Sequence, residues 1–118
     1  MDQNQLLELK ESYYEYIAKV PQGLQLIVDF LNNNELENAL NGIADLAEGL
    51  EFLLKIEQAF VSEGLKINSR IHEAMTIFNE MSDSLENEDY ILLKDLVEYE
   101  LMPIFSSASE WIFQKEVE

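Results

Sequence analysis

The chain has 118 residues, the size of one domain, and we expect a single helical-bundle domain over residues 1–118. Its 24 acidic and seven basic residues give a formal net charge of −17, which repels phosphates and anionic lipid headgroups and so disfavours binding to nucleic acid or membranes. Four glycines, two prolines and no cysteine favour helices and exclude disulfides and thiolate metal sites.

The start of the chain has no feature of a secretion signal. Residues 1–5 are polar and acidic, without the basic and then apolar character of such a segment. No apolar run approaches the roughly 18 residues that would suggest a membrane span. We therefore expect a cytoplasmic location.

A first helix is predicted by apolar residues spaced three and four apart from Leu6 to Leu31. Asp2 and Gln5 are suited to cap its start. Pro21 lies inside the pattern, and because the spacing continues past it, we expect one helix with a kink at Pro21. A true break at this position is the alternative.

Three asparagines, residues 32–34, are expected to end this helix, because asparagine tolerates the left-handed backbone of a helix C-terminus. Asn34 and Glu37 form a capping-box pattern for a second helix. This helix should stop near Gly64, a residue suited to follow a helix. If Gly64 does not break the chain, residues 35–86 form one helix that is too long for a compact monomer, and an extended or swapped dimer results.

Two further helices are predicted by the same spacing, from Ile67 to Leu85 and from Tyr90 to Ile112. Asn87 is suited to cap the last one. Pro103 lies within its continuing apolar stripe, which predicts a second kink. Together these elements predict an all-α fold, an antiparallel up-down-up-down four-helix bundle with coiled-coil-like packing and Pro-kinked first and last helices.

The two predicted turns between these helices resemble each other. Leu31–Leu36 and Leu85–Tyr90 share a leading leucine followed by Asn and Glu residues, and the second turn also contains Asp89. Two related helical hairpins are one interpretation. The other is that any tight turn between helices selects these residues for capping.

The sequence contains no recognisable pattern for catalysis or metal binding. His72 is the only histidine, is expected at the surface, and cannot supply a bundle-type di-metal site, which needs two histidines. The four glycines are isolated and form no phosphate loop. The acidic residues 86–89 lack the spacing and glycine of a calcium loop. We therefore predict no enzyme activity, no cofactor and no metal.

Two pairs of residues near the apolar stripes allow two interpretations each. Glu57 and Glu100 either are buried, which would raise their carboxyl pKa, or extend to solvent from the edge of a stripe. Gly42 and Gly49 lie one heptad apart, where they either let a neighbouring backbone approach closely or are simply tolerated.

The most informative feature is an excess of apolar residues beyond one stripe per helix. Some widen the core, and we predict that the rest form an interface with a partner. The candidate interface residues are Tyr14, Tyr16, Phe30, Phe52, Ile56, Phe105, Trp111 and Phe113. For the aromatic residues near the two ends of the chain, the alternative is that they close the open end of the core.

Helix number, helix length and turns such as Asn33–Leu36 give a layout that resembles flagellar export chaperones of the flagellin-binding type. The resemblance extends over most of the chain. It implies a small cytoplasmic helical bundle that wraps an aggregation-prone segment of a client protein. It assigns no binding residue in this chain.

Two functions follow from these patterns. The first is a non-enzymatic protein–protein interaction module, a chaperone-like or adaptor bundle whose apolar groove accepts a helix or segment of a partner. The alternative is a structural or regulatory homodimer, for example an acidic antagonist of a basic protein. In the second case the surplus apolar surface is self-complementary.

Overall fold

The computed structural model describes residues 1–115, most of which are helical. Two long helices, α1 (Gln3–Asn32) and α2 (Leu36–Ser62), precede a short strand β1 (Leu65–Ile67) and helix α3 (Ile71–Glu86). The C-terminal part contains α4 (Tyr90–Asp95), the π-helix η1 (Leu96–Leu101), α5 (Met102–Ser106), the 3₁₀ turn η2 (Ala108–Glu110) and strand β2 (Phe113–Lys115). The prediction of a helical fold is confirmed, and the small two-stranded sheet is an addition to it.

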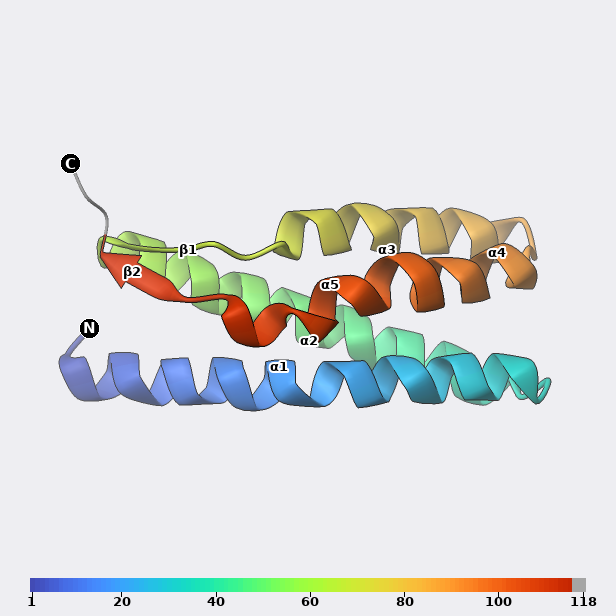
Figure 1. Cartoon of the computed structure of the whole chain (residues 1–118), viewed down its shortest axis with the longest axis horizontal. Helices are drawn as coiled ribbons and strands as arrows, with labels where there is room; N and C mark the ends of the chain where they lie inside the picture. The colour runs from blue at the N-terminus through green and yellow to red at the C-terminus, as the bar shows by residue number, and fades with distance from the viewer. Residues whose placement is uncertain (116–118) are drawn as a thin grey trace.

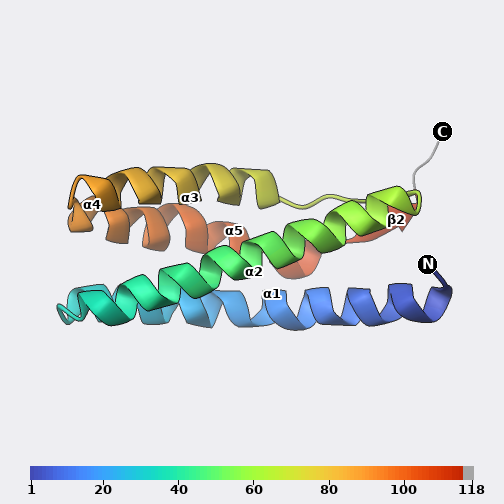
Figure 2. The same cartoon turned by 180° about the vertical axis from the view of Figure 1, so that it is seen from behind.

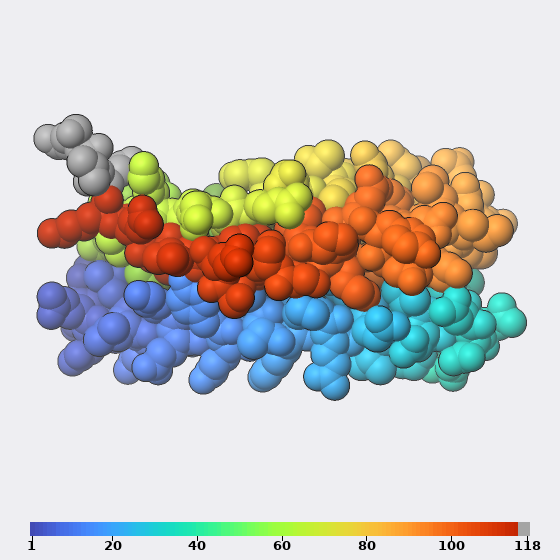
Figure 3. All heavy atoms as spheres, in the orientation of Figure 1, coloured from blue at the N-terminus to red at the C-terminus, as the bar shows by residue number. Residues whose placement is uncertain are grey.

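The long segments lie along the longest dimension of a molecule that measures 48 × 24 × 21 Å. Figure 1 shows α1 and α2 as one antiparallel pair, and α3 with the α4–α5 segment as another. Figure 2 shows from behind that α2 crosses α1 at an incline. In Figure 3 the segment from α4 to η2, drawn in orange to red, lies against α1.

Helix α1 continues unbroken through Pro21, as the apolar spacing predicted (Figure 1). It begins with the predicted capping box. The Asp2 carboxylate accepts a hydrogen bond from the Gln5 N–H at 2.8 Å, and the Gln5 side chain accepts one from the Asp2 N–H at 3.1 Å. These bonds satisfy donors that the first turn of a helix leaves free.

The asparagine run ends α1 through a left-handed residue, as expected. Asn34 has a φ of 58°, and the next residue, Glu35, donates its N–H to the carbonyl of Phe30 at 2.8 Å. This bond satisfies a carbonyl at the C-terminus of the helix. The predicted capping box is wrong, because Asn34 belongs to the end of α1 and Glu35 occupies the N-cap of α2 without a side-chain hydrogen bond.

The turn between α3 and α4 has the same geometry. Glu88 has a φ of 55°, and Asp89 donates its N–H to the carbonyl of Ser84 at 2.8 Å. Asp89, and not Asn87 as predicted, caps the next helix by accepting from the N–H of Leu92 at 3.0 Å. The similar sequences of the two turns therefore correspond to similar structures.

Gly64 breaks the chain after α2. Its φ of +82° is a conformation that glycine adopts without steric cost, and residues 35–86 are therefore not one helix. The prediction that the third helix contains Ile67 is wrong. Ile67 lies in β1 and pairs in antiparallel register with Phe113 of β2.

The last α-helix ends at Ser106 and is followed by the 3₁₀ turn η2, so the helix does not continue through the C-terminal aromatic residues as predicted. Before Pro103 the helix widens into a π-helix, in which the N–H of Met102 donates to the carbonyl of Val97. Pro103 offers no N–H to the carbonyl of Tyr99, and its ring would crowd that carbonyl in an α-helix. The wider π turn accommodates the proline.

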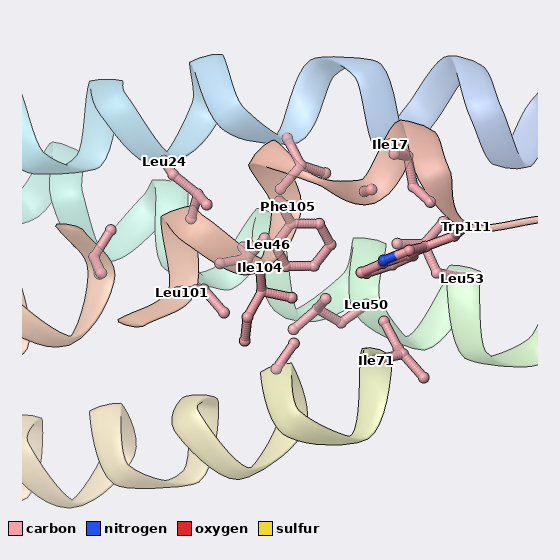
Figure 4. Packing of buried hydrophobic residues seen from close by; sticks show 14 of the residues in the cluster. Ile17, Leu24, Leu46, Leu50, Leu53, Ile71, Leu101, Ile104, Phe105 and Trp111 are labelled. Carbon is pink, nitrogen blue, oxygen red and sulfur yellow. The ribbon is translucent and has the colours of Figure 1, made fainter. Parts of the chain in front are cut away.

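The core lies between the two helical pairs. Figure 4 shows Leu24 of α1, Leu50 of α2 and Ile71 of α3 directed into the same space as Phe105 of α5. Trp111 follows α5 and also lies there, with its ring 5.7 Å from that of Phe105. All five side chains are buried, so segments from the whole length of the chain contribute to one core.

Candidate functional site

An apolar groove with a volume of about 380 Å³ lies between α1 and α2. All of its lining residues come from these two helices. Val20, Leu24, Ile27 and Leu46 are the buried part of the lining, whereas Leu26 is 49% exposed. The groove is thus open to solvent, and its buried lining residues also belong to the core.

Two glycines, one on each helix, line the groove. At Gly42 an added Cβ would lie 2.9 Å from Cγ1 of Ile27, so the two helices approach closely there. At Gly23 an added Cβ would meet no heavy atom within 4 Å in the described part of the chain. A glycine inside a helix costs about 1 kcal/mol relative to alanine. Gly23 therefore lowers stability without a contact in this structure that requires it.

An aromatic pair extends the apolar surface at one end of the groove. The rings of Tyr16 and Phe52 meet edge to face at 6.0 Å. Tyr16 lies over Gly49, where an added Cβ would overlap the tyrosine hydroxyl. Gly42 and Gly49 are therefore both sites of close packing, but the atoms that approach them belong to the side chains of Ile27 and Tyr16 and not to a neighbouring backbone as predicted. Phe52 remains 41% exposed.

The polar residues of the groove include both charged residues and asparagines. Asp45 of α2, Lys19 of α1, and the exposed Asn38 and Asn41 belong to its lining. Burial raises the pKa of Tyr16, and the negative charge of Asp45 adds to that effect. An apolar recess with an acidic residue at its margin is therefore open on a molecule of net charge −17.

Three of the predicted interface residues lie at this groove. Tyr16 and Phe30 line it, and Phe52 adjoins it through its contact with Tyr16. They come from both helices, and the α1–α2 packing brings them together. These three remain candidates for contact with a partner.

The other predicted interface residues do not form a free surface. Ile56, Phe105, Trp111 and Phe113 are buried in the core, so the prediction of an interface is corrected for these four. Tyr14 is partly buried, and its hydroxyl donates to the carbonyl of Trp111. Apolar character alone did not distinguish the residues that the C-terminal segment brings into the core.

The aromatic residues near the two ends of the chain pack on one another. Phe113 stacks on Phe60 with ring centroids 4.1 Å apart, and it meets the edge of Tyr13 at 4.9 Å. Asn68 adds a polar contact by accepting from the N–H of Ile112 at 2.7 Å. The alternative interpretation, in which these aromatic residues close the core, describes this cluster.

Gly23 and Leu26 line the groove but are not among the interface residues predicted from the sequence. Gly23 lies just after Pro21, where a helix break was the alternative, and Leu26 belongs to the surplus of apolar residues. The signal that could have identified Gly23 is an isolated glycine in the middle of a long apolar stripe, far from either predicted end. Without a neighbouring helix in view, that signal does not distinguish a break from a groove.

A buried carboxylate joins three segments away from the groove. Glu57 of α2 is 7% exposed, and it accepts hydrogen bonds from Tyr13 of α1 at 2.7 Å and from Ser69 before α3 at 2.8 Å. Burial raises the pKa of Glu57, and the two hydrogen bonds and the charge of His72 partly offset this. Of the two predicted possibilities, Glu57 is therefore buried, whereas Glu100 is exposed.

Among residues 1–115, no group of three His, Cys, Asp or Glu side chains could hold a metal ion. His72 is exposed, as predicted. No helix of the described residues is long and apolar enough to cross a membrane.

The family of the chain follows from its sequence. A family model described as "Domain of unknown function (DUF8042)" matches residues 8–110, and the chain belongs to this family. The match includes every residue that lines the groove and ends before β2. Comparison with curated proteins and with solved structures found no match.

Proposed function

We propose that this member of the DUF8042 family is a non-enzymatic protein-binding module that holds a helix of another protein in the groove between α1 and α2. The observation that carries the proposal is Gly23. Its Cβ position is open space inside an apolar groove, and no atom of the described chain occupies that space. A partner that approaches the backbone of α1 at this point gives the glycine a role that offsets its cost in stability.

The dimensions of the groove suit a helix. Its lining extends along α1 from Tyr16 to Phe30, about 21 Å at the rise of an α-helix. A partner helix presents apolar side chains at intervals of three, four and seven residues over such a length. The half-exposed Leu26 and Phe52 would be removed from water by that contact.

The remaining expectations form part of the same proposal. A protein partner is favoured over nucleic acid or a membrane surface, because a net charge of −17 repels both. The cytoplasmic location and the chaperone-like role implied by the resemblance to flagellar export chaperones also stay proposals. In the chaperone case, the occupant of the groove would be a segment of the client.

A homodimer is the competing proposal, with a second copy of the chain in the groove. Two copies would bring two net charges of −17 together, and their repulsion opposes this contact. We therefore expect light scattering after size exclusion to give a monomer of 13.7 kDa at two protein concentrations. A stable dimer that dissociates when the groove is filled would instead establish the homodimer.

A matched pair of leucines on α1 tests the groove. Leu26 lines it and is 49% exposed, whereas Leu7 lies outside it and is 57% exposed. Helical peptides selected from a displayed amphipathic library against the wild-type chain would be titrated by calorimetry against Leu26→Gln and Leu7→Gln. We expect about tenfold weaker binding to Leu26→Gln, because burial of a leucine contributes about 1.5 kcal/mol or more. Binding to Leu7→Gln should be unchanged.

Two results would count against the groove. One is an equal loss of affinity in both leucine variants, which would place the contact elsewhere on α1. The other is a library that yields no helical binder although the chain is folded by circular dichroism. In either case the open space at Gly23 would have no occupant of this kind.

A further inference from the structure

We infer that the partner helix is basic: its apolar stripe enters the groove, and its Lys or Arg side chains face the acidic margin that Asp45 and Glu48 form on α2. This inference rests on the proposed function and specifies the chemistry of the occupant. It depends on the negative charges of these two carboxylates, which no basic residue of the groove lining neutralises.

The acidic margin follows one side of α2. Asp45 belongs to the groove lining, and Glu48 comes three residues later, between Asp45 and Phe52. Residues spaced three and four apart along a helix are neighbours on its surface. Both carboxylates are exposed, and Asp45, as part of the lining, lies where the flank of a helix seated in the groove would pass.

These two carboxylates have no cation of their own in residues 1–115. The ion pairs in this range join the N-terminal amino group to Glu63, and Arg70 to Glu73. Lys19 is the one basic residue of the groove lining, and it pairs with neither margin carboxylate. A basic partner would supply the charges that the margin lacks.

The charge of the whole molecule acts in the same direction. Acidic residues outnumber basic ones in both α1 and α2, and the chain carries −17 in total. Such a field accelerates the approach of a cationic partner and disfavours an anionic one. A second copy of the chain, or an acidic helix, would instead place like charges beside Asp45.

Three synthetic peptides of about 18 residues, long enough to span the groove, test the inference. The first has a leucine stripe at helical spacing and lysines elsewhere. The second replaces the lysines with glutamates, and the third scrambles the first so that its composition stays the same and the stripe is lost. Each is titrated into the wild-type chain at about 0.05 M and about 0.3 M NaCl.

Two charge variants show where the peptide lies. Asp45→Lys changes the groove margin, and Glu80→Lys makes the same change of charge at an exposed position on α3, outside the groove. We expect the lysine peptide with the stripe to bind at least tenfold more tightly than the other two peptides at the lower salt concentration. Asp45→Lys should weaken this binding by about fivefold, Glu80→Lys by less than twofold, and the higher salt concentration should reduce the difference between the variants.

The possible failures are distinguishable. Equal affinity of the lysine and glutamate peptides, with loss of both in Leu26→Gln, would overturn the inference and keep the groove. A scrambled peptide that binds as tightly as the striped one would overturn the inference by showing attraction to the whole acidic surface alone. No binding by either striped peptide, together with a stable dimer of the chain, would overturn the proposed function itself.

Discussion

Replacing Tyr13 with Phe removes one hydroxyl from the interior of the molecule. Tyr13 is 0% exposed, and its hydroxyl donates to Glu57, a carboxylate that is 7% exposed, at 2.7 Å. Phenylalanine keeps the ring and its edge contact with Phe113. The substitution therefore isolates one hydrogen bond to a buried carboxylate while the packing around it is retained.

The expected loss is about 2 kcal/mol of unfolding free energy at neutral pH, because a hydrogen bond to a charged group contributes about 1.5–3 kcal/mol. Ser69 remains as a second donor to Glu57, which keeps the carboxylate from being wholly unpaired. A domain of this size shifts its melting temperature by about 4 °C for each kcal/mol. Tyr13→Phe should therefore melt about 8 °C below the wild type.

The loss should depend on pH. Burial raises the pKa of Glu57 in the folded chain, and the hydrogen bond from Tyr13 lowers it, so removal of the hydroxyl raises the pKa further. For a carboxyl group with a raised folded pKa, the stabilising contribution is fully present below the unfolded pKa and is lost as pH rises through the folded pKa. The melting temperature of the variant should therefore lie further below that of the wild type at about pH 8 than at about pH 5.

Thermal unfolding followed by circular dichroism at both pH values measures this effect. Tyr99→Phe is the control, because Tyr99 is 67% exposed and loses a hydroxyl at the surface. Its melting temperature should match the wild type at both pH values. If the melting temperature of Tyr13→Phe also matched that of the wild type, or fell by more at about pH 5 than at about pH 8, the hydroxyl would not be stabilising a buried carboxylate.

Two further predictions concern the groove and the charge. Gly23→Ala should raise the melting temperature by about 4 °C. Gly42→Ala, whose Cβ would meet Ile27 at 2.9 Å, should leave the melting temperature unchanged or lower it. Scanning fluorimetry measures both variants, and a higher melting temperature for Gly42→Ala than for Gly23→Ala would contradict the groove geometry. Because a charge of −17 repels itself in the compact state, the melting temperature should be higher at about 0.5 M than at about 0.02 M salt. An unchanged value would indicate that the acidic residues are dispersed or locally paired.

The long helices were predictable because the spacing of apolar residues reports which side of a helix is buried. The spacing from Leu6 to Leu31 correctly indicated that α1 continues through Pro21. It failed at Ile67, which precedes Ile71 by one helical turn yet lies in a strand. A strand of three residues is too short to show alternation, and β1 pairs with β2 near the other end of the chain. No local pattern indicates such a pairing.

The candidate site was predictable only in part, because apolar character does not say which segment will cover a residue. Phe52 and Ile56 lie one turn apart on the same side of α2, yet Phe52 is 41% exposed and Ile56 is 3% exposed. The difference arises from the tertiary arrangement, in which other segments cover one part of that side. Trp111 and Phe113 are buried for a related reason, since the chain leaves its α-helix at Ser106 and, after the 3₁₀ turn η2, returns to the core in an extended form.

Gly23 shows a different limit of sequence reasoning. Its local preference conflicts with its position, because glycine is a poor helix former and yet lies inside a helix of 30 residues. From the sequence, one helix with a kink at Pro21 was expected, and a break in the helix at this position was the alternative. The structure keeps the helix and leaves the space beside Gly23 open, so the conflict persists within the isolated chain. Disagreement between local preference and overall fold is expected at functional positions, and the partner helix that we propose for the groove would account for it at Gly23.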